Sequence, residues 1–114
     1  MTVEELSRAL SLETVVAGDG GREATGGYCG DLLSWVMGRA PSGCVWLTVM
    51  GNVNAIAVAV LADVACILLT EGSPLDEAAQ IRAEAQGVAV LRSPRPAYEL
   101  AVEIHHLLEK EGTP

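Results

Sequence analysis

The sequence lacks phenylalanine and contains only two tryptophans and two tyrosines among its 114 residues. Half of the residues are nevertheless hydrophobic. Because aromatic side chains contribute so little, the core must be built mainly from alanine, valine and leucine. Such small aliphatic side chains suit helices that pack closely on a sheet. A chain of this length is expected to form a single domain, residues 1–114, with one core.

Basic residues are also scarce. Seven lysines and arginines stand against 15 acidic residues, which gives a formal net charge of −8. A chain with this charge repels phosphate backbones and anionic lipid surfaces, and its scattered arginines form no basic stripe. We therefore expect no binding to nucleic acid or to a membrane. A single arginine near a helix amino terminus could still hold a small anion locally.

Long apolar runs and paired cysteines are missing as well. The longest apolar run, residues 55–62, is far shorter than the roughly 20 residues that a membrane-spanning helix needs. The amino terminus is acidic and helical in pattern, which is not typical of a signal peptide. Three cysteines without a C-x-x-C spacing indicate free thiols, not a disulfide framework or a zinc site. We expect a cytoplasmic protein without a metal or cofactor.

Segments with helical and strand-like patterns alternate along the chain. Fully apolar segments predict buried strands, and amphipathic or alanine-rich segments predict helices. The expected strands are residues 12–17, 44–50, 64–70 and 88–91. The expected helices are residues 3–10, 31–37, 55–63 and 73–86, with a final one that includes residues 100–108. This order predicts an α/β fold, with a mainly parallel sheet of about four strands and helices on both faces.

Capping residues predict where several helices begin and end. Asp31 is expected to be the N-cap of the second helix, which Gly38 closes. Ser73 is expected to cap the fourth helix, with Pro74 at its first position and Gly87 after its end.

The stretch GDGGREATGGYCGDLL, residues 18–33, holds six glycines. It contains the two glycines of the P-loop pattern G-x-x-x-x-G-K-[ST]. Gly27 and Tyr28, however, stand where that pattern needs the phosphate-binding lysine and the magnesium-binding hydroxyl. ATP hydrolysis by this loop is therefore not expected.

The polar residues of this glycine loop leave two interpretations open. Arg22 could grip a phosphate or carboxylate, with Thr25 and the amides of Gly26 and Gly27 as further donors. Alternatively, Arg22 pairs with Asp31, and the loop is an internal staple that needs no ligand. The staple is the more common role for such a loop, so we favour it.

Further polar residues follow two of the expected strands. Asn52 and Asn54 come after the central strand, and Glu71 follows the next one. Open parallel sheets bind ligands at the carboxyl ends of their strands, so these side chains join the candidate ligand site. Capping a helix is the simpler role for either asparagine. No catalytic residues are expected, because the serines lack a nucleophile elbow and the adjacent histidines cannot share a metal.

The chain resembles the DRTGG-type domain in the order of its elements and in three short patterns. These patterns are Arg22-x-x-Thr25-Gly26-Gly27 with Asp31-Leu32-Leu33, then Asn54-x-x-Ala57, then Glu71-Gly72. The resemblance spans roughly residues 3–108. Domains of this type accompany CBS pairs in adenine-nucleotide-sensing proteins, occur on phosphotransacetylases, and have a relative in front of the HPr kinase domain. The resemblance implies a small regulatory domain that pairs with itself and has no catalytic residues.

Two hypotheses about function follow. In the first, the chain is a non-catalytic regulatory or sensor domain that acts through homodimerisation and is tuned by a small anion such as an adenine nucleotide. The residues expected to bind this ligand are Arg22, Thr25, Gly26, Gly27, Asp31, Asn52, Asn54 and Glu71. In the second, it is a ligand-free interaction module that docks on a partner enzyme or kinase through an apolar patch near Trp35 or Trp46.

Overall fold

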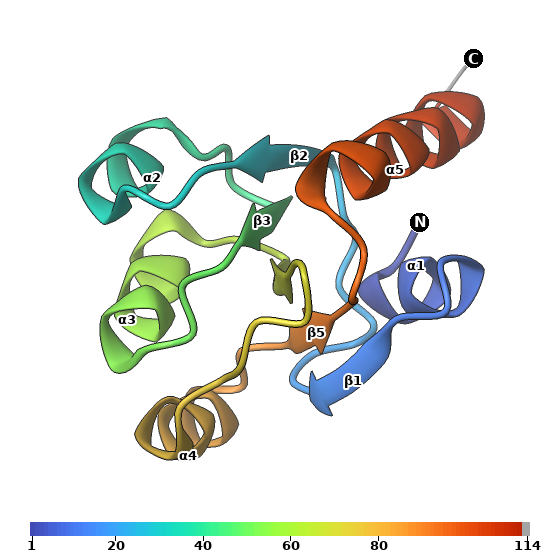
Figure 1. The fold of residues 1–114 in the computed structure, drawn as a ribbon. Helices are drawn as coiled ribbons and strands as arrows, with labels where there is room; N and C mark the ends of the chain where they lie inside the picture. Colours follow the sequence, from blue (N-terminus) through green and yellow to red (C-terminus); the bar gives the residue numbers. More distant parts are fainter. Residues whose placement is uncertain (113–114) are drawn as a thin grey trace.

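The computed structural model describes residues 1–112, which form five helices and five strands (Figure 1). In chain order these are α1 (Val3–Ala9), β1 (Glu13–Val16), β2 (Gly26–Cys29), α2 (Leu33–Arg39), β3 (Cys44–Thr48), α3 (Val53–Ala62), β4 (Cys66–Leu69), α4 (Glu77–Gln86), β5 (Val90–Arg92) and α5 (Ala97–Gly112). The strands form one sheet in the order β1-β5-β4-β3-β2. Strands β2 to β5 are parallel, and β1 pairs antiparallel with β5. The expected mainly parallel α/β sheet is confirmed.

Helices cover both faces of this sheet, as the sequence predicts. Figure 1 shows α2, α3 and α4 on one side and α1 and α5 on the other. Side chains of the central strand alternate between the two layers: Trp46 packs under α2 and α3, whereas Val45 and Leu47 pack under α1 and α5. Among the described residues, no helix has the length and apolar character needed to cross a membrane.

Nearby side chains and glycines set three helix ends, and those at Asn52 and Gly87 are as expected. Thr2 and Glu5 form a capping box at the start of α1. Asn52 caps α3, because its side-chain oxygen accepts a hydrogen bond from the Ala55 amide at 2.9 Å. Gly87 ends α4 in the left-handed conformation that suits glycine.

The two other expected caps are wrong. Leu32, not Asp31, is the N-cap of α2, and the Asp31 carboxylate instead accepts hydrogen bonds at the end of β3. Helix α4 begins only at Glu77, so Ser73 does not cap it; the Ser73 hydroxyl donates to the Thr70 carbonyl at 2.7 Å. In both cases the side chain forms hydrogen bonds with other groups and does not cap the helix that the local pattern predicted.

The glycine loop contains a strand that the sequence did not predict. Gly26–Cys29 form β2, which pairs with β3 at the edge of the sheet. Glycine weakens strands because it adds no side-chain packing, so a segment that starts with two glycines gives little local signal. Helix α2 likewise does not stop at Gly38 but continues to Arg39.

Trp46 cannot form an exposed docking patch, and this part of the second hypothesis is wrong. Its side chain is 0% exposed in the core, and its indole N–H donates to the Gly30 carbonyl at 2.8 Å. Trp35, in contrast, is 51% exposed on α2.

Candidate functional site

The arginine of the glycine loop is bound within the chain. Arg22 Nη1 donates to Asp63 Oδ1 at 2.7 Å, and Nη2 donates to the Asp63 main-chain carbonyl at 2.9 Å. Asp63 follows α3 in the left-handed conformation, and the Ser42 hydroxyl donates to its other carboxylate oxygen. These contacts tie the loop to the end of α3 and to the turn before β3. Arg22 therefore does form a staple, but its acidic partner is Asp63 and not Asp31.

This tie shifts the pKa of both partners. The hydrogen bond from Arg22, followed by the one from Ser42, lowers the pKa of Asp63 from 3.8 to about 2. The same carboxylate raises the pKa of Arg22. The Arg22 side chain is 32% exposed and that of Asp63 is 59% exposed. Water therefore screens the pair, and its contribution to stability is modest.

Main-chain groups of the loop also have internal partners. The amide of Gly21 donates to the Asp19 carboxylate, and the amide of Arg22 donates to the Asp19 carbonyl. The carbonyls of Gly20 and Arg22 accept hydrogen bonds from amides in the first turn of α1. An anion-binding loop points its amides at the ligand. Here the amides fold the loop onto itself, and its carbonyls complete the start of a helix.

Thr25 holds the turn that leads into β3. Its amide donates to the Gly43 carbonyl at 2.9 Å, and its hydroxyl donates to the Ser42 carbonyl at 3.3 Å. Gly43 has a φ of +81°, and a Cβ there would lie 2.7 Å from Thr25 Oγ1, so the turn requires glycine. Gly26 and Gly27 continue from Thr25 as the first residues of β2.

Asp31 lies beyond the opposite end of β2. Its Oδ1 accepts hydrogen bonds from the Thr48 hydroxyl at 2.7 Å and from the Val49 amide at 3.0 Å. Because Thr48 is buried, these bonds fix the chain where β2 and β3 end. The length of β2 separates Asp31 from Arg22, which explains why the expected pair between them does not form.

The segment before α4 covers part of the carboxyl edge near Asn52. A Cβ on Gly51 would lie 2.0 Å from the Pro74 carbonyl oxygen, so this segment rests directly on Gly51. The Gly51 carbonyl also accepts a hydrogen bond from the Asp76 amide at 2.8 Å. Asn52 is occupied as a helix cap, and Asn54 is exposed on the first turn of α3.

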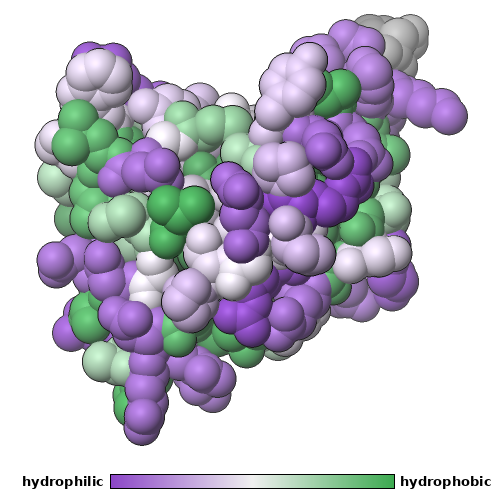
Figure 2. Space-filling view, in the orientation of Figure 1, coloured by the Kyte–Doolittle hydropathy of each residue, from purple (hydrophilic) through white to green (hydrophobic). Residues whose placement is uncertain are grey.

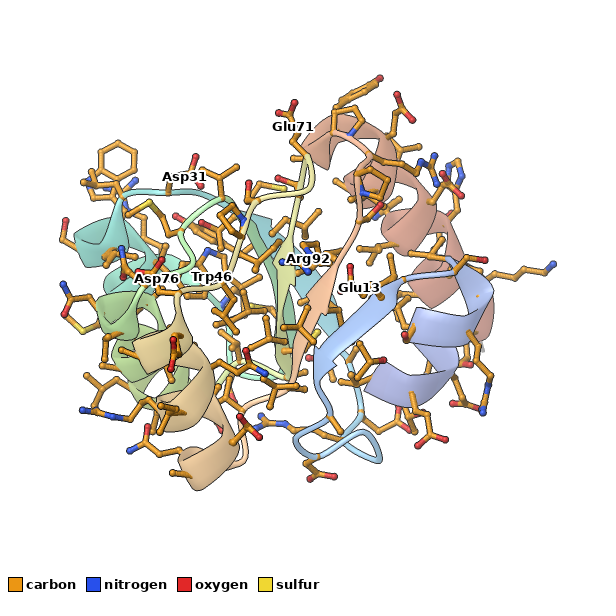
Figure 3. The ribbon with its side chains drawn as sticks, turned by 60° about the horizontal axis from the view of Figure 1, so that its bottom comes forward. Glu13, Asp31, Trp46, Glu71, Asp76 and Arg92 are labelled. Carbon is orange, nitrogen blue, oxygen red and sulfur yellow. The ribbon has the colours of Figure 1, made fainter. Side chains whose placement is uncertain are left out.

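A hollow of about 310 Å³ lies at the carboxyl edge, between the ends of β2, β3 and β4. Asp31, Thr48, Thr70 and Glu71 contribute to its lining. Glu71 has a φ of 55°, and its amide donates to the Arg95 carbonyl at 2.9 Å. Figure 3 shows Asp31 and Glu71 at the same end of the molecule. Two carboxylates beside one hollow disfavour the binding of a phosphate group there.

Two arginines near this edge, Arg92 and Arg95, are not among the expected ligand residues. Arg92, at the end of β5, donates to both carboxylate oxygens of Glu13 on β1, at 3.1 and 2.8 Å. Arg95 pairs with Glu99 and Glu103 on α5. Their positions after a strand were a usable signal, but the Glu13 partner lies 79 residues away in the sequence. As in the glycine loop, carboxylates of the chain itself neutralise these cations.

The expected ligand residues therefore lie at two ends of the parallel strands and do not form one site. Arg22, Thr25, Gly26 and Gly27 lie at or near the amino end of β2. Asp31, Asn52, Asn54 and Glu71 lie beyond the carboxyl ends of β2, β3 and β4.

A groove of about 510 Å³ runs between β2 and α5. One wall contains Gly26, Gly27 and Cys29, and the other includes Ile104 and Leu108. Its lining is mainly glycine and apolar side chains, with the charged or titratable groups of α5 at one side. This chemistry suits an apolar or main-chain contact better than a nucleotide phosphate.

The described residues contain no cluster that is built for catalysis with a metal. No three histidine, cysteine, aspartate or glutamate side chains among them could hold a metal ion. In the same part of the chain, every buried polar side-chain atom has a hydrogen-bond partner. His105 lies on the exposed side of α5, where it contacts Glu109 at 3.3 Å. His106 is exposed as well, so both histidines are surface residues.

Comparison with known families identifies this fold. A family model of the DRTGG domain matches residues 42–107, which is more than half of the chain. This chain belongs to the DRTGG domain family. The match begins after the glycine loop, so membership does not depend on the Arg22-x-x-Thr25-Gly26-Gly27 pattern. No curated protein sequence matches the chain.

The DRTGG fold also aligns with a solved structure. That structure contains the CBS and DRTGG domains of the regulatory region of Clostridium perfringens pyrophosphatase, complexed with its activator diadenosine tetraphosphate. The TM-score is 0.67 at 11% sequence identity, and the match covers 89% of this chain and 44% of that chain. At this identity the likeness shows the fold alone. The present chain spans less than half the length of that regulatory region.

Proposed function

We propose that this DRTGG chain is a non-catalytic regulatory domain that acts by pairing with a second copy of itself. Its family and the regulatory region that shares its fold support a regulatory role. The cations at the sheet edges are paired within the chain, so they are not free to bind a ligand, and this favours a role through contact with another copy. Arg22, Arg92 and Arg95 each pair with a carboxylate of the same chain.

Other groups that could have held a ligand are also occupied. The Thr25 hydroxyl fixes a turn, Asn52 caps α3, and Asp31 joins the ends of β2 and β3. Among the described residues there is also no group of metal-ligating side chains that could activate a substrate. A domain of this kind can transmit a signal by contact with another chain, and homodimers are the most common form of such contact.

Sedimentation equilibrium tests the pairing directly. Over about 1–100 μM, a range that detects a dimer with a Kd of micromolar order, we expect a mass of twice the 11.9 kDa chain. A mass of 11.9 kDa throughout this range would contradict the proposal. Specific binding of that monomer to a purified enzyme or kinase would then favour the second hypothesis, with Trp35 as the exposed aromatic anchor.

Tuning by an adenine nucleotide is a second candidate, which one observation favours. The regulatory region with the related fold is complexed with diadenosine tetraphosphate, although that region includes CBS domains as well. In the present chain, a phosphate that approached Arg22 would have to displace the Asp63 carboxylate.

A thermal-shift measurement with ATP and with diadenosine tetraphosphate tests this candidate. A ligand at 100 times its Kd stabilises a protein by about 2.7 kcal/mol, so binding should raise the melting temperature by several degrees. The rise should disappear in Arg22→Ala and persist in Arg8→Ala. If millimolar nucleotide leaves the melting temperature of the wild-type chain unchanged, tuning by these nucleotides is wrong.

A further inference from the structure

One long stretch of the chain is nearly free of charge. Residues 32–62 contain a single charged side chain, Arg39, although the whole chain has 15 acidic and seven basic residues. This stretch forms α2, β3 and α3, and β3 is completely buried. The outer sides of α2 and α3 therefore form a surface without a carboxylate of their own. We call this surface the α2–α3 face; its exposed apolar residues are Leu32, Trp35, Met37, Val60 and Leu61.

Beyond Asn54 in its first turn, helix α3 is apolar on the side that faces water. Ala55, Ile56 and Ala59 are buried against the sheet, whereas Leu61 is 71% exposed and Val60 is 44% exposed. Figure 2 shows hydrophobic atoms along the left side of the molecule, where Figure 1 places α2 and α3. A helix that is hydrophobic all round is normally covered, and a group of exposed apolar side chains marks an interface.

We propose that a second copy of this chain binds the α2–α3 face, with α3 packed against the partner's α3 about a two-fold axis. This inference rests on the homodimer proposed above and names its surface. The net charge of the chain explains why a second copy would bind at this face. Two copies that each carry a net charge of −8 repel one another unless they meet where carboxylates are absent, and like charges brought together at an interface are strongly unfavourable.

The opposite side of the molecule is unsuited to this pairing. The edge strand β2 and the groove beside α5 could in principle accept another strand or helix. Helix α5, however, is rich in acidic residues: Glu99, Glu103, Glu109 and Glu111. A two-fold contact at that groove would bring the acidic helices of the two copies close together, whereas the α2–α3 face avoids this.

The area that a dimer needs is a modest share of the surface of the chain. A stable interface of ordinary size buries about 800 Å² per partner. That is roughly one-seventh of the 5853 Å² of accessible surface of this chain. Helices α2, α3 and α4 cover one whole face of the sheet (Figure 1). A self-complementary contact uses the same patch on both copies.

Two matched variants test this surface. Leu61→Asp places a carboxylate on α3, and Val102→Asp places one at an exposed aliphatic position on α5. We expect Leu61→Asp to raise the dimer Kd, measured by sedimentation equilibrium, at least about 100-fold, because a two-fold interface contains the substitution twice. Val102→Asp should change the Kd by less than about 3-fold. The uncharged variant Leu61→Gln should raise it about 10-fold.

Each outcome distinguishes the two proposals. If the wild-type chain forms no dimer, the proposed function and this surface are both wrong. If it dimerises and neither Leu61 variant weakens the dimer, only the surface is wrong. A loss of dimer in Val102→Asp alone would place the interface at α5. Circular dichroism checks that each variant is folded, and Leu61→Gln decides the result if Leu61→Asp is not.

Discussion

Replacing Arg22 with alanine should destabilise the free protein even though no ligand is present. Arg22 makes an ion pair with the Asp63 carboxylate and a hydrogen bond to the Asp63 carbonyl. A partly exposed ion pair contributes about 0.2–1 kcal/mol, and a hydrogen bond contributes about 0.5–1.5 kcal/mol. We therefore expect Arg22→Ala to lower the free energy of unfolding by about 1–2 kcal/mol. For a domain near this size, that is a fall of roughly 4–8 °C in melting temperature.

Thermal and urea denaturation, followed by circular dichroism, measure this change. Arg8→Ala is the matched control, because Arg8 is 71% exposed and lies 3.4 Å from Glu4 on the same helix. The control should change the free energy of unfolding by less than about 0.5 kcal/mol. If Arg22→Ala is as stable as Arg8→Ala, the tie has no structural role and Arg22 is available for a ligand.

The same tie predicts a dependence on pH. The folded pKa of Asp63 is about 2, below its ordinary value of 3.8, so the unfolded chain takes up the proton first as the pH falls. The stabilisation from Asp63 is complete above its unfolded pKa and is lost between about pH 4 and pH 2. Arg22→Ala should lose less stability over this range, because the tie is already absent. Equal losses in the variant and the wild-type chain would contradict this expectation.

Two further pairs of variants test the carboxyl edge by urea denaturation. Asn52→Ala should lower the free energy of unfolding by about 1 kcal/mol through loss of the helix cap, while Asn54→Ala should change it by less than about 0.5 kcal/mol; equal effects would argue against the cap. Gly51→Ala should destabilise by about 1–3 kcal/mol or more, because its Cβ would meet Pro74. Gly38→Ala, with free space in a helix, should stabilise by up to about 1 kcal/mol. If Gly51→Ala leaves the free energy of unfolding unchanged, the segment at Pro74 can move to make room for the added methyl group.

The sequence predicts the parts of the fold that depend on neighbouring residues. The fully buried strands β3 and β4 appear as continuous apolar runs, and a strand buried on both faces needs no other signal. The Asn52 cap and the Gly87 end of α4 follow from side-chain chemistry within a few residues. Together with the alternation of helices and strands, these signals were enough to predict a mainly parallel sheet.

The parts that were missed depend on residues far apart in the chain. Strand β2 exists because its glycines pair with β3, and its own side chains give little sign of this. Arg22 finds Asp63 41 residues away, after the chain has passed through β2, α2, β3 and α3. Asp31 was available as a helix cap, but the buried Thr48 hydroxyl provides a hydrogen bond that only the folded sheet brings near. Local patterns cannot choose between partners of this kind.

The most direct test of the proposed pairing is an isotope-filtered NOE experiment on a mixture of ¹³C-labelled and unlabelled chains. Only contacts between different copies give signals in such a spectrum. We expect these signals from the Leu61 and Val60 methyl groups of α3 and from Met37 of α2, which are exposed in the single chain. An absence of signals between copies, or signals confined to β2 and α5, would contradict pairing through the α2–α3 face.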